Sequence, residues 1–444
     1  MRISKLLTPL ALTALFAACS SDDVSTDNDI VVDSSKTEIK LGVSNRGSST
    51  RGAGPIESLS AGTVKGFGMF MLATHVTGTN PPPDTHPINI KWNDPTARKW
   101  AVWWDNFKAD AVPGADGTSI EVQWNDLGDA SLKERNWYPV GNWYSYRFYG
   151  YYPYCNNVTR DEKRITVHFG ADELDGSTDL IYGRSKGYDA SDVHNKYRFN
   201  ARYFREKDNL GFEPELPSVS FEHLLMRLQF SVVAEPDPHK TGDQYESART
   251  MMVKSVELQS VPASADLIVA DFDSDANPEN TPSAVGQPLY PYGSDLAGKI
   301  TFHWNEGDPT HNLALRGTDG NALNPSDAAV ADAIDNPTGT ISSGDYAGMG
   351  YLDIGQPIML PVPEDPQFQF TVKVVLVKDY GTADEQEFVS EWPMVLDNSV
   401  PFKSGYSYRV MMHVAGPREV TLKATLTPWN TDDEGDAIKE LIFN

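Results

Sequence analysis

The sequence predicts an all-β protein made of two antiparallel β-sandwich domains in tandem, with few and short helices. Segments in which polar and apolar residues alternate recur along the chain, and they are rich in Val, Phe, Tyr and Thr. Gly, Pro, Asn and Asp bound these segments, which is typical of strands joined by turns and loops. The chain has 444 residues, which is enough for two domains of ordinary size.

The expected strands follow one another from the N-terminal region to the end of the chain. In chain order they lie at residues 37–44, 63–72, 144–154, 164–170, 218–233, 251–261, 368–380, 406–414 and 419–429. In the last of them, four apolar residues share one face: Val420, Leu422, Ala424 and Leu426. This alternation is typical of an antiparallel strand with one buried face. The best helical segment is 324–335, with Ser326 or Asp327 as its N-cap.

A polar segment with two prolines, residues 234–247, separates two of the expected strands. Such composition is typical of a domain boundary. We therefore expect an N-terminal domain over 37–234 and a C-terminal domain over 235–444. The acidic, loop-rich segment 264–350 is interpreted as an elaboration of the second domain.

The N-terminus has the features of a lipoprotein leader. Residues 1–18 have basic residues at the start and an apolar stretch too short to span a membrane, as in a signal peptide. Small residues then precede Cys19, as at a lipidation site, although Phe16 stands where Leu is usual. The acidic segment 19–36 has the composition of an unstructured tether. We expect a lipid on Cys19 to anchor the protein to a membrane without spanning it.

Charge and cysteine content exclude several classes of partner and of stabilisation. The formal net charge is −25, which argues against nucleic acid or anionic lipid as a partner. The chain has two cysteines, Cys19 and Cys155. If Cys19 carries lipid, no intramolecular disulfide is available, and the hydrophobic core must hold the fold together.

No motif in the chain indicates an enzyme, a cofactor or a metal centre. Residues 183–187 match the G-x-S-x-G pattern of serine hydrolases, but the following segment is a poor helix and the match is attributed to chance. The acidic run Asp271, Asp273 and Asp275 begins like a calcium loop, yet it lacks the glycine and glutamate of an EF-hand. It is interpreted as a solvated turn in preference to a weak calcium site. His223 is interpreted as a hydrogen-bonded structural residue.

The order of several segments resembles the fimbrillin family, the pilin-like lipoproteins of Bacteroides- and Porphyromonas-type bacteria. After the leader and tether come a short strand and an Arg-containing loop, followed by a series of recognisable strands. These strands are "VKGFGMFML" (64–72), "YRFYGYYP" (146–153), "TDLIYGRS" (178–185), "VSFEHLLMRLQFSV" (219–232), "PFKSGYSYRVMMHV" (401–414) and a last one that ends at Trp429. The resemblance depends on their order and spacing along most of the chain.

The resemblance implies two transthyretin-like sandwich domains and a structural role in a fimbria that serves adhesion and biofilm formation. Fimbrillins reach the outer membrane as lipoproteins, where an Arg-specific protease cuts the loop after the first strand. A strand from the C-terminal region of another subunit then fills the opened groove. The expected partners are therefore other pilin subunits, that protease, and a surface ligand of a host or another bacterium.

The residues of the first strand and the loop after it suit this mechanism. In 37–44, Ile39, Leu41 and Val43 alternate inward, and their loss would uncover apolar sites and an open sheet edge. The following Gly/Ser-rich linker is exposed and carries Arg46 and Arg51, of which Arg46 is slightly preferred as the cleavage site. The favoured donor is the apolar face of the 419–429 strand, and the last residues, 437–444, are the second candidate.

A glycan-binding surface lipoprotein of a polysaccharide-utilisation system is the alternative interpretation. Seven tryptophans lie close together in the first domain: Trp92, Trp100, Trp103, Trp104, Trp124, Trp137 and Trp143. Exposed aromatic rings stack on sugars, although aromatic residues of β-sandwiches more often lie in the core. The Arg-containing linker favours the fimbrial interpretation, because a glycan-binding module has no use for a removable strand.

Overall fold

The structure is a computed structural model of the whole chain, and it is described here for most of the two expected domains. The described residues are 37–45, 65–76, 89–113, 120–124, 133–139, 143–170, 172–174, 176–187, 199–205, 214–261, 264–272, 288–289, 298–303, 312–314, 329–342, 346–362, 370–394, 404–417, 419–428 and 440–442. The expected signal peptide and tether, residues 1–36, lie outside these residues. Within them the protein is all-β, as predicted, with short helices.

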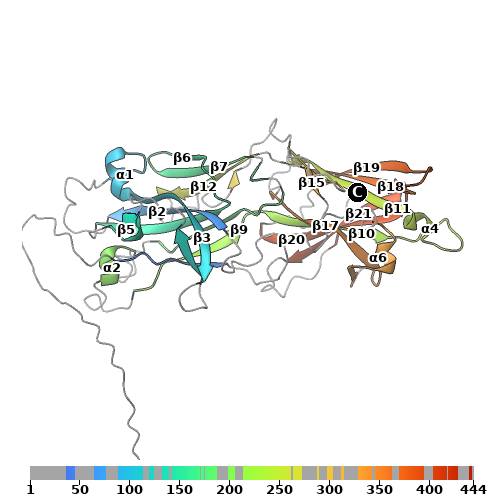
Figure 1. Ribbon diagram of the computed structural model, residues 1–444, viewed down its shortest axis with the longest axis horizontal. Helices are drawn as coiled ribbons and strands as arrows, with labels where there is room; N and C mark the ends of the chain where they lie inside the picture. Colours follow the sequence, from blue (N-terminus) through green and yellow to red (C-terminus); the bar gives the residue numbers. More distant parts are fainter. Residues whose placement is uncertain are drawn as a thin grey trace, which may run out of the picture. The chain divides into compact units, whose positions relative to one another are not determined.

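The first sheet is closed on itself, in the order β1-β4-β3-β2-β5-β8-β9. Figure 1 labels β2, β3, β5 and β9 of this sheet. Its strands are β1 (Gly42–Asn45), β2 (Lys65–Val76), β3 (Val102–Pro113), β4 (Ile120–Trp124), β5 (Tyr144–Tyr152), β8 (Ile181–Arg184) and β9 (Ser218–His223). Strand β1 closes it, because it pairs with β4 on one side and with β9 on the other. The β1–β9 pairing is parallel, whereas the other pairings of this sheet are antiparallel.

A second, smaller sheet has the order β13-β12-β7-β6. Its strands are β6 (Val158–Arg160), β7 (Arg164–Phe169), β12 (Ala265–Asp271) and β13 (Pro288–Leu289). β12 comes after the expected domain boundary at 234/235, yet it pairs with β7 and lies beside it in the ribbon (Figure 1). The division at that boundary remains a prediction, and the first core includes this later strand.

Aromatic side chains fill the first core, and two glycines make room for them. A Cβ atom on Gly68 would lie 2.2 Å from the ring of Tyr151, and one on Gly150 would lie 2.6 Å from the ring of Phe221. Real Cβ contacts are never this short, so both positions require glycine in the present packing. Dense packing of large rings thus supplies the stability that disulfides do not.

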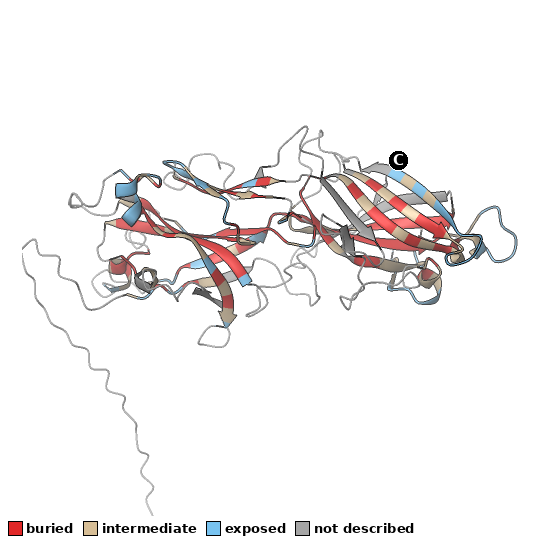
Figure 2. Ribbon diagram, turned by 45° about the horizontal axis from the view of Figure 1, so that its top comes forward, coloured by how far each residue is buried: buried red, intermediate tan, exposed pale blue. Residues whose placement is uncertain are grey.

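The second half of the chain contains two further sheets that enclose a second core. One sheet has the order β16-β17-β10-β20-β21-β22, and the other has the order β15-β14-β11-β18-β19. Their strands are β10 (Met226–Ala234), β11 (Met251–Val261), β14 (Gly298–His303), β15 (Asn312–Ala314), β16 (Gly339–Thr340), β17 (Gly350–Leu360), β18 (Phe370–Lys378), β19 (Gln386–Met394), β20 (Tyr406–Gly416), β21 (Glu419–Pro428) and β22 (Glu440–Ile442). Buried residues follow the strands around both cores, whereas α1 and many turns are exposed (Figure 2).

The helices are short and lie between strands. They are α1 (Pro95–Ala101), the 3₁₀ helix η1 (Lys133–Asn136), α2 (Ala201–Arg205), α4 (Glu246–Arg249) and α6 (Asp332–Asp335). The helix predicted over 324–335 is wrong for Ala329, which instead forms a β-bridge with Met252. The N–H of Val330 also donates to the carbonyl oxygen of Met251, so α6 begins only at Asp332. Ser326 and Asp327 lie outside the described residues.

The segment predicted as one strand over 218–233 is divided between the two cores. β9 ends at His223 and β10 begins at Met226, and each strand joins a different sheet. At the break, the N–H of Leu224 donates to Leu180 O, and Leu225 O accepts from the N–H of Gly405. Neighbouring segments therefore satisfy the backbone groups that the interrupted ladder leaves open.

Candidate functional site

The first described segment, residues 37–45, is held by backbone hydrogen bonds along its length. The N–H of Ile39 donates to Asn136 O at 2.9 Å, and the N–H of Tyr138 donates to Thr37 O at 2.9 Å. The N–H of Gly42 donates to Pro217 O at 3.0 Å, directly before the parallel ladder with β9. The regular strand is shorter than predicted, since β1 begins at Gly42 and the preceding residues form a single bridge at Glu38.

Successive residues of this segment alternate between the core and solvent. Of the three apolar residues predicted to point inward, Ile39 and Leu41 are buried. Ile39 is 6% exposed and Leu41 is 2% exposed, whereas Lys40 between them is exposed. Both buried residues belong to the first core. Val43 is in register with Val219 of β9, and the structure does not describe its side chain further.

The position of β1 determines what its removal would do. β4 and β9 have no direct ladder with each other among the described strands, and β1 joins them. Without residues 37–45 the closed sheet would have two open edges, and the places of Ile39 and Leu41 in the core would be empty. An open edge beside apolar sites is a template for an added strand.

The segment 133–139 pairs with the residues that precede β1. The indole N–H of Trp103 donates to Trp137 O at 2.9 Å, and that of Trp104 donates to Arg135 O at 2.8 Å. The Arg135 guanidinium lies over the Trp103 ring, 4.2 Å from its centroid. These contacts fix residues 133–139 to β3. The segment is therefore a rigid support for its backbone hydrogen bonds to Ile39 and Thr37.

Both candidate donor segments belong to the six-stranded sheet. β21 pairs with β20 over its whole length, and its residues 420, 422, 424 and 426 are in register with four buried residues of β20. Those four residues are Val414, Met412, Val410 and Tyr408. β22, from the second candidate segment 437–444, pairs with β21 at three positions and is the last strand of the sheet order.

The expected processing and anchoring residues lie outside the described part of the chain. These are Cys19, Arg46 and Arg51, and they remain predictions. In the part that the structure describes, no helix is both long and apolar enough to cross a membrane.

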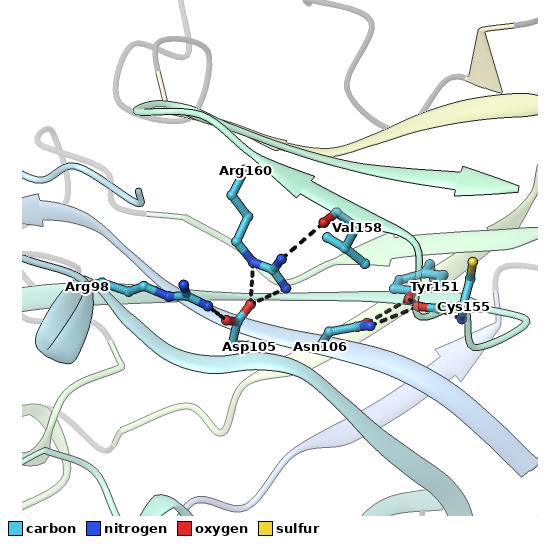
Figure 3. Close-up of polar contacts among 7 residues, drawn as sticks. All are labelled: Arg98, Asp105, Asn106, Tyr151, Cys155, Val158 and Arg160. Atoms are coloured by element: carbon cyan, nitrogen blue, oxygen red, sulfur yellow. Dashed lines mark hydrogen bonds and ion pairs between the residues drawn. The ribbon is translucent and has the colours of Figure 1, made fainter. Parts of the chain in front are cut away.

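A polar network links β3 to the β6–β7 hairpin (Figure 3). Asp105 accepts a hydrogen bond from Arg98 and another from Arg160 Nε, the latter at 2.7 Å. Asn106, whose φ of 58° lies in the left-handed region that Asn tolerates, donates its side-chain amide to Cys155 O at 2.8 Å. The hydroxyl of Tyr151 lies 2.6 Å from Asn106 Oδ1. Asp105 of β3 is thus paired with two guanidinium groups, one from α1 and one from β6. This network, the Asp105 clamp, holds the three elements together.

One exposed hydrogen-bond chain has the order of groups found in a catalytic triad. His168 Nε2 lies 2.8 Å from Thr159 Oγ1, and its Nδ1 lies 2.6 Å from Asp266 Oδ1. The three residues lie on neighbouring strands of the smaller sheet, where the backbone N–H groups are engaged in ladders. Nucleophilic catalysis also needs an oxyanion hole and a substrate cleft, and neither the cleft at Asp237 and His239 nor the cleft at Thr74 and Phe272 includes these three.

The residues that raised other chemical hypotheses have structural partners. Ser185 of the G-x-S-x-G match is buried, and its hydroxyl accepts from Phe148 N at 3.0 Å. Asp271 accepts from Arg164 at 2.8 Å, while Asp273 and Asp275 lie outside the described residues. His223 is paired with buried Asp179 at 2.7 Å, which confirms its structural interpretation. The described residues include no group of three His, Cys, Asp or Glu side chains placed to hold a metal ion.

Cys155 is a free, buried thiol. Its Sγ lies 3.3 Å from His168 O, and burial raises the pKa of the thiol. A neutral buried thiol is a poor nucleophile, so Cys155 is a packing residue.

The tryptophans are largely structural. Trp92 and Trp104 are fully buried, and Trp143 packs against the first core. Trp100 and Trp103 are partly buried and stack on each other at 6.3 Å with nearly parallel rings. Nothing is described of the Trp124 side chain. The clustering that suggested glycan stacking thus mainly reflects an aromatic core.

Sequence reasoning identified the first strand but missed the surfaces that hold it. The parallel pairing with β9 and the supporting segment 133–139 are long-range contacts that the sequence does not encode locally. One signal was available in the sequence, because β9 overlaps residues 219–232, a segment that carries part of the family resemblance.

The chain is similar to proteins of a known family and to several solved structures. A family model described as fimbrillin-like matches residues 115–429, which is more than half of the chain. A fimbrial protein of Bacteroides vulgatus is similar with a TM-score of 0.39 and 12% identity, covering 88% of this chain and 99% of the other. The fimbrial anchor protein Mfa2 of Porphyromonas gingivalis has a TM-score of 0.28 and 9% identity, covering 89% of this chain and 98% of the other. No curated protein matches the sequence.

Proposed function

Because this chain belongs to the fimbrillin-like family, we propose that it is a non-enzymatic structural subunit of a cell-surface fimbria with a role in adhesion and biofilm formation. The observation that carries the proposal is the place of β1, which closes the first sheet between β4 and β9. A strand in that place is separable from the rest of the domain, because it lies at the start of the chain and before a linker with two arginines.

Assembly proceeds by exchange of this strand. An Arg-specific protease cuts after Arg46 or Arg51, and residues 37–45 then remain attached only by noncovalent contacts. Another subunit supplies a strand that takes over the ladder to β9 and the apolar positions of Ile39 and Leu41. Before cleavage, a lipid on Cys19 holds the subunit at the outer membrane.

Two observations support a donor from the last residues, 437–444, rather than from β21. Release of β22 breaks a three-residue pairing at the end of the sheet order, whereas release of β21 breaks its full-length pairing with β20. β21 is also in register with four buried residues of β20, so its loss would open the second core. The terminal segment therefore costs the donor subunit less stability.

The experiment that tests the proposal is brief treatment of the purified protein with an Arg-specific protease, followed by N-terminal sequencing and electrophoresis. We expect one cut in the linker, an intact body, and a ladder of SDS-resistant polymers visible as filaments by electron microscopy. The variants Arg46→Gln and Arg51→Gln identify the cut, since only one of them blocks it.

A deletion of residues 437–444 provides the control for the donor. It is expected to be cut normally and to remain monomeric, and a deletion that still polymerises would favour β21 as the donor. A linker that is cut without any polymer, in the full-length protein at high concentration, would overturn strand exchange.

Hydrogen exchange supplies an independent measurement on the same samples. The amide of Tyr138 donates to Thr37 O in the uncut protein, so it is protected while the first segment is bound. Displacement of that segment should expose the amide in a peptide that covers 133–139. Protection should return when a donor strand is bound.

A further inference from the structure

A cleft lies beside α4, where several strands around the second core end. Three parts of the chain line it: the segment 237–247 that leads from β10 into α4, the neighbouring ends of β18 and β19, and the turn after β20. Its volume is about 340 Å³, which is within the range of small-molecule sites. The cleft therefore has the size of a ligand site, and its lining decides which ligand suits it.

Backbone hydrogen bonds fix these parts of the chain to one another. The N–H of Glu235 donates to Val414 O of β20 at 2.9 Å, which holds the start of the segment against that strand. The N–H of Asp379, directly after β18, donates to Thr250 O, directly after α4, at 3.0 Å. The walls are thus held in place without a ligand, which lowers the entropic cost of binding one.

Asp237 offers the cleft a carboxylate that has acceptor positions left. Its Oδ1 accepts from the N–H of His239 at 2.8 Å, and its Oδ2 accepts from the hydroxyl of Ser247 at 3.4 Å. Within the described part of the chain, no cationic side chain forms an ion pair with Asp237. A carboxylate has about four acceptor positions, so about two remain for hydrogen-bond donors of a ligand.

Two further polar side chains line the cleft. Across the described residues, neither the ring of His239 nor the amide of Gln386 has a hydrogen bond or an ion pair. Both residues are exposed, so a ligand can reach these groups. An amide both donates and accepts, and an imidazole adds a further ring N–H. Together with Asp237, the two residues thus offer donors as well as acceptors.

Phe388 and Pro417 supply the apolar part of the lining. Phe388 is partly buried and packs against the second core, so its ring is held in position. An aromatic ring beside convergent polar groups is suited to a molecule with one apolar face and a polar rim. The C–H face and the hydroxyls of a sugar ring are such a combination.

The charges at the cleft argue against a charged ligand. The carboxylate of Asp237 repels an anion, as does a chain with a net charge of −25. The ammonium group of Lys378 also lines the cleft and disfavours a cation, and it is itself paired with Asp379 at 3.5 Å. A neutral molecule with several hydrogen-bonding groups fits both charges.

We propose that this cleft binds a neutral sugar, that is, an uncharged pyranose ring with several free hydroxyls. Asp237 accepts from two neighbouring hydroxyls, Gln386 and His239 bond to others, and the C–H face of the ring packs on Phe388. The ligand is either a free monosaccharide or the terminal residue of a glycan chain. The binding does not depend on strand exchange, since the cleft is complete in a single uncut subunit.

Saturation-transfer NMR on the uncut protein tests the proposal, with the methyl glycosides of glucose, galactose and mannose as probes. Cyclohexanol is the control for the hydroxyls, because it has a six-membered ring with a single one. Glucuronate is the control for charge, because it has the glucose ring with a carboxylate added. We expect at least one glycoside to bind about tenfold more tightly than either control.

Two glutamine variants separate the cleft from the general surface. Gln386→Ala should weaken binding of that glycoside about three- to tenfold, because one neutral hydrogen-bonding group is lost. Gln244→Ala is the matched control, because Gln244 is also exposed and lies in the same segment of chain but does not line the cleft. It should bind the glycoside as the unaltered protein does.

Asp237→Asn tests the carboxylate. It keeps an oxygen that accepts from the N–H of His239 but removes the charge, and it should weaken binding about tenfold. Thermal unfolding of the three variants shows whether each is folded, so a loss of binding is assigned to the side chain and not to unfolding.

Three results would overturn the proposal: no saturation transfer to any of the glycosides, equal binding of cyclohexanol, or equal binding by the Gln386→Ala and Gln244→Ala variants. Comparison of the bound glycoside with an oligosaccharide that ends in the same sugar distinguishes the two sources. Tighter binding of the oligosaccharide would indicate a glycan chain, and equal binding a free sugar. Failure of polymerisation in the preceding experiment leaves these results unaffected, so the two hypotheses are tested separately.

Discussion

Ile39 and Asn136 are joined by a 2.9 Å hydrogen bond from the backbone N–H of the first to the carbonyl oxygen of the second. They are almost one hundred residues apart in the chain, and the bond fixes the expected removable segment to the rigid support beside β3. Two contributions thus retain this segment: a few backbone bonds and two apolar side chains. The second contribution can be weakened by mutation without change to the first.

We expect Ile39→Ala and Leu41→Ala each to lower the free energy of unfolding by about 2–5 kcal/mol, because both side chains are buried in the first core. Urea denaturation measures this loss. After cleavage, both variants should also polymerise faster, since less apolar contact holds the old strand. Lys40→Ala, at the exposed residue between them, should change stability by less than about 0.5 kcal/mol. Equal effects at all three positions would contradict the buried placement.

The second prediction concerns the Asp105 clamp. Asp105→Asn keeps the shape of the side chain but removes the charge that pairs with Arg98 and Arg160. Because Arg160 is largely shielded from solvent, we expect a loss of about 1–3 kcal/mol in urea denaturation. Lys186→Gln, at an exposed ion pair, is the control and should cost less than about 1 kcal/mol. A negligible effect of Asp105→Asn would mean that the clamp does not stabilise the fold.

Buried tyrosines predict how stability depends on alkaline pH. Burial raises the pKa of Tyr144 to about 12, and it raises the pKa values of Tyr138, Tyr146 and Tyr151 well above 10. Between pH 10 and 12 the unfolded chain therefore binds fewer protons than the folded protein, so the free energy of unfolding falls as pH rises. Below pH 10 this contribution is fully present. Urea midpoints measured from pH 9 to 12 should decline, and tyrosinate absorbance should rise together with unfolding.

The fourth prediction is that Gly150→Ala destabilises the first core by about 1–3 kcal/mol, because the new methyl would lie 2.6 Å from the Phe221 ring. Phe221→Leu in the same chain should recover part of that loss, since it removes the clashing atoms. Gly187→Ala is the matched control: its methyl would meet the flexible end of Arg147 at 3.2 Å. Thermal unfolding compares the variants, and an unchanged midpoint for Gly150→Ala would refute the tight packing.

Much of the fold could be predicted from the sequence because alternation is a local property. β11 over Met251–Val261 has the predicted bounds, and β21 and β7 end one residue earlier than expected. The same reasoning did not find β3, whose Trp103 and Asn106 interrupt a simple alternation, and it joined β9 and β10 into one strand. The break at Leu224 and Leu225 depends on backbone partners distant in the chain, which no local pattern shows.

The candidate site was predictable only in part, for the same reason. The inward alternation of Ile39 and Leu41 is readable from their spacing, and burial confirms it. The strands that pair with this segment could not be predicted, because the parallel ladder with β9 joins residues that are far apart in the chain.

The place of β12 in the sheet with β7 has a consequence for biosynthesis. A chain that emerges from the ribosome or the export channel cannot complete its first core until residue 271 has appeared. By then β10 and β11 have already been made, although their own partners β17, β18 and β20 come later. Nascent subunits thus expose unfinished sheets until late in secretion, when premature pairing between neighbouring chains is the main hazard. An intact β1 closes the first sheet once β9 has formed, and in the proposed assembly route that edge stays closed until the linker is cut.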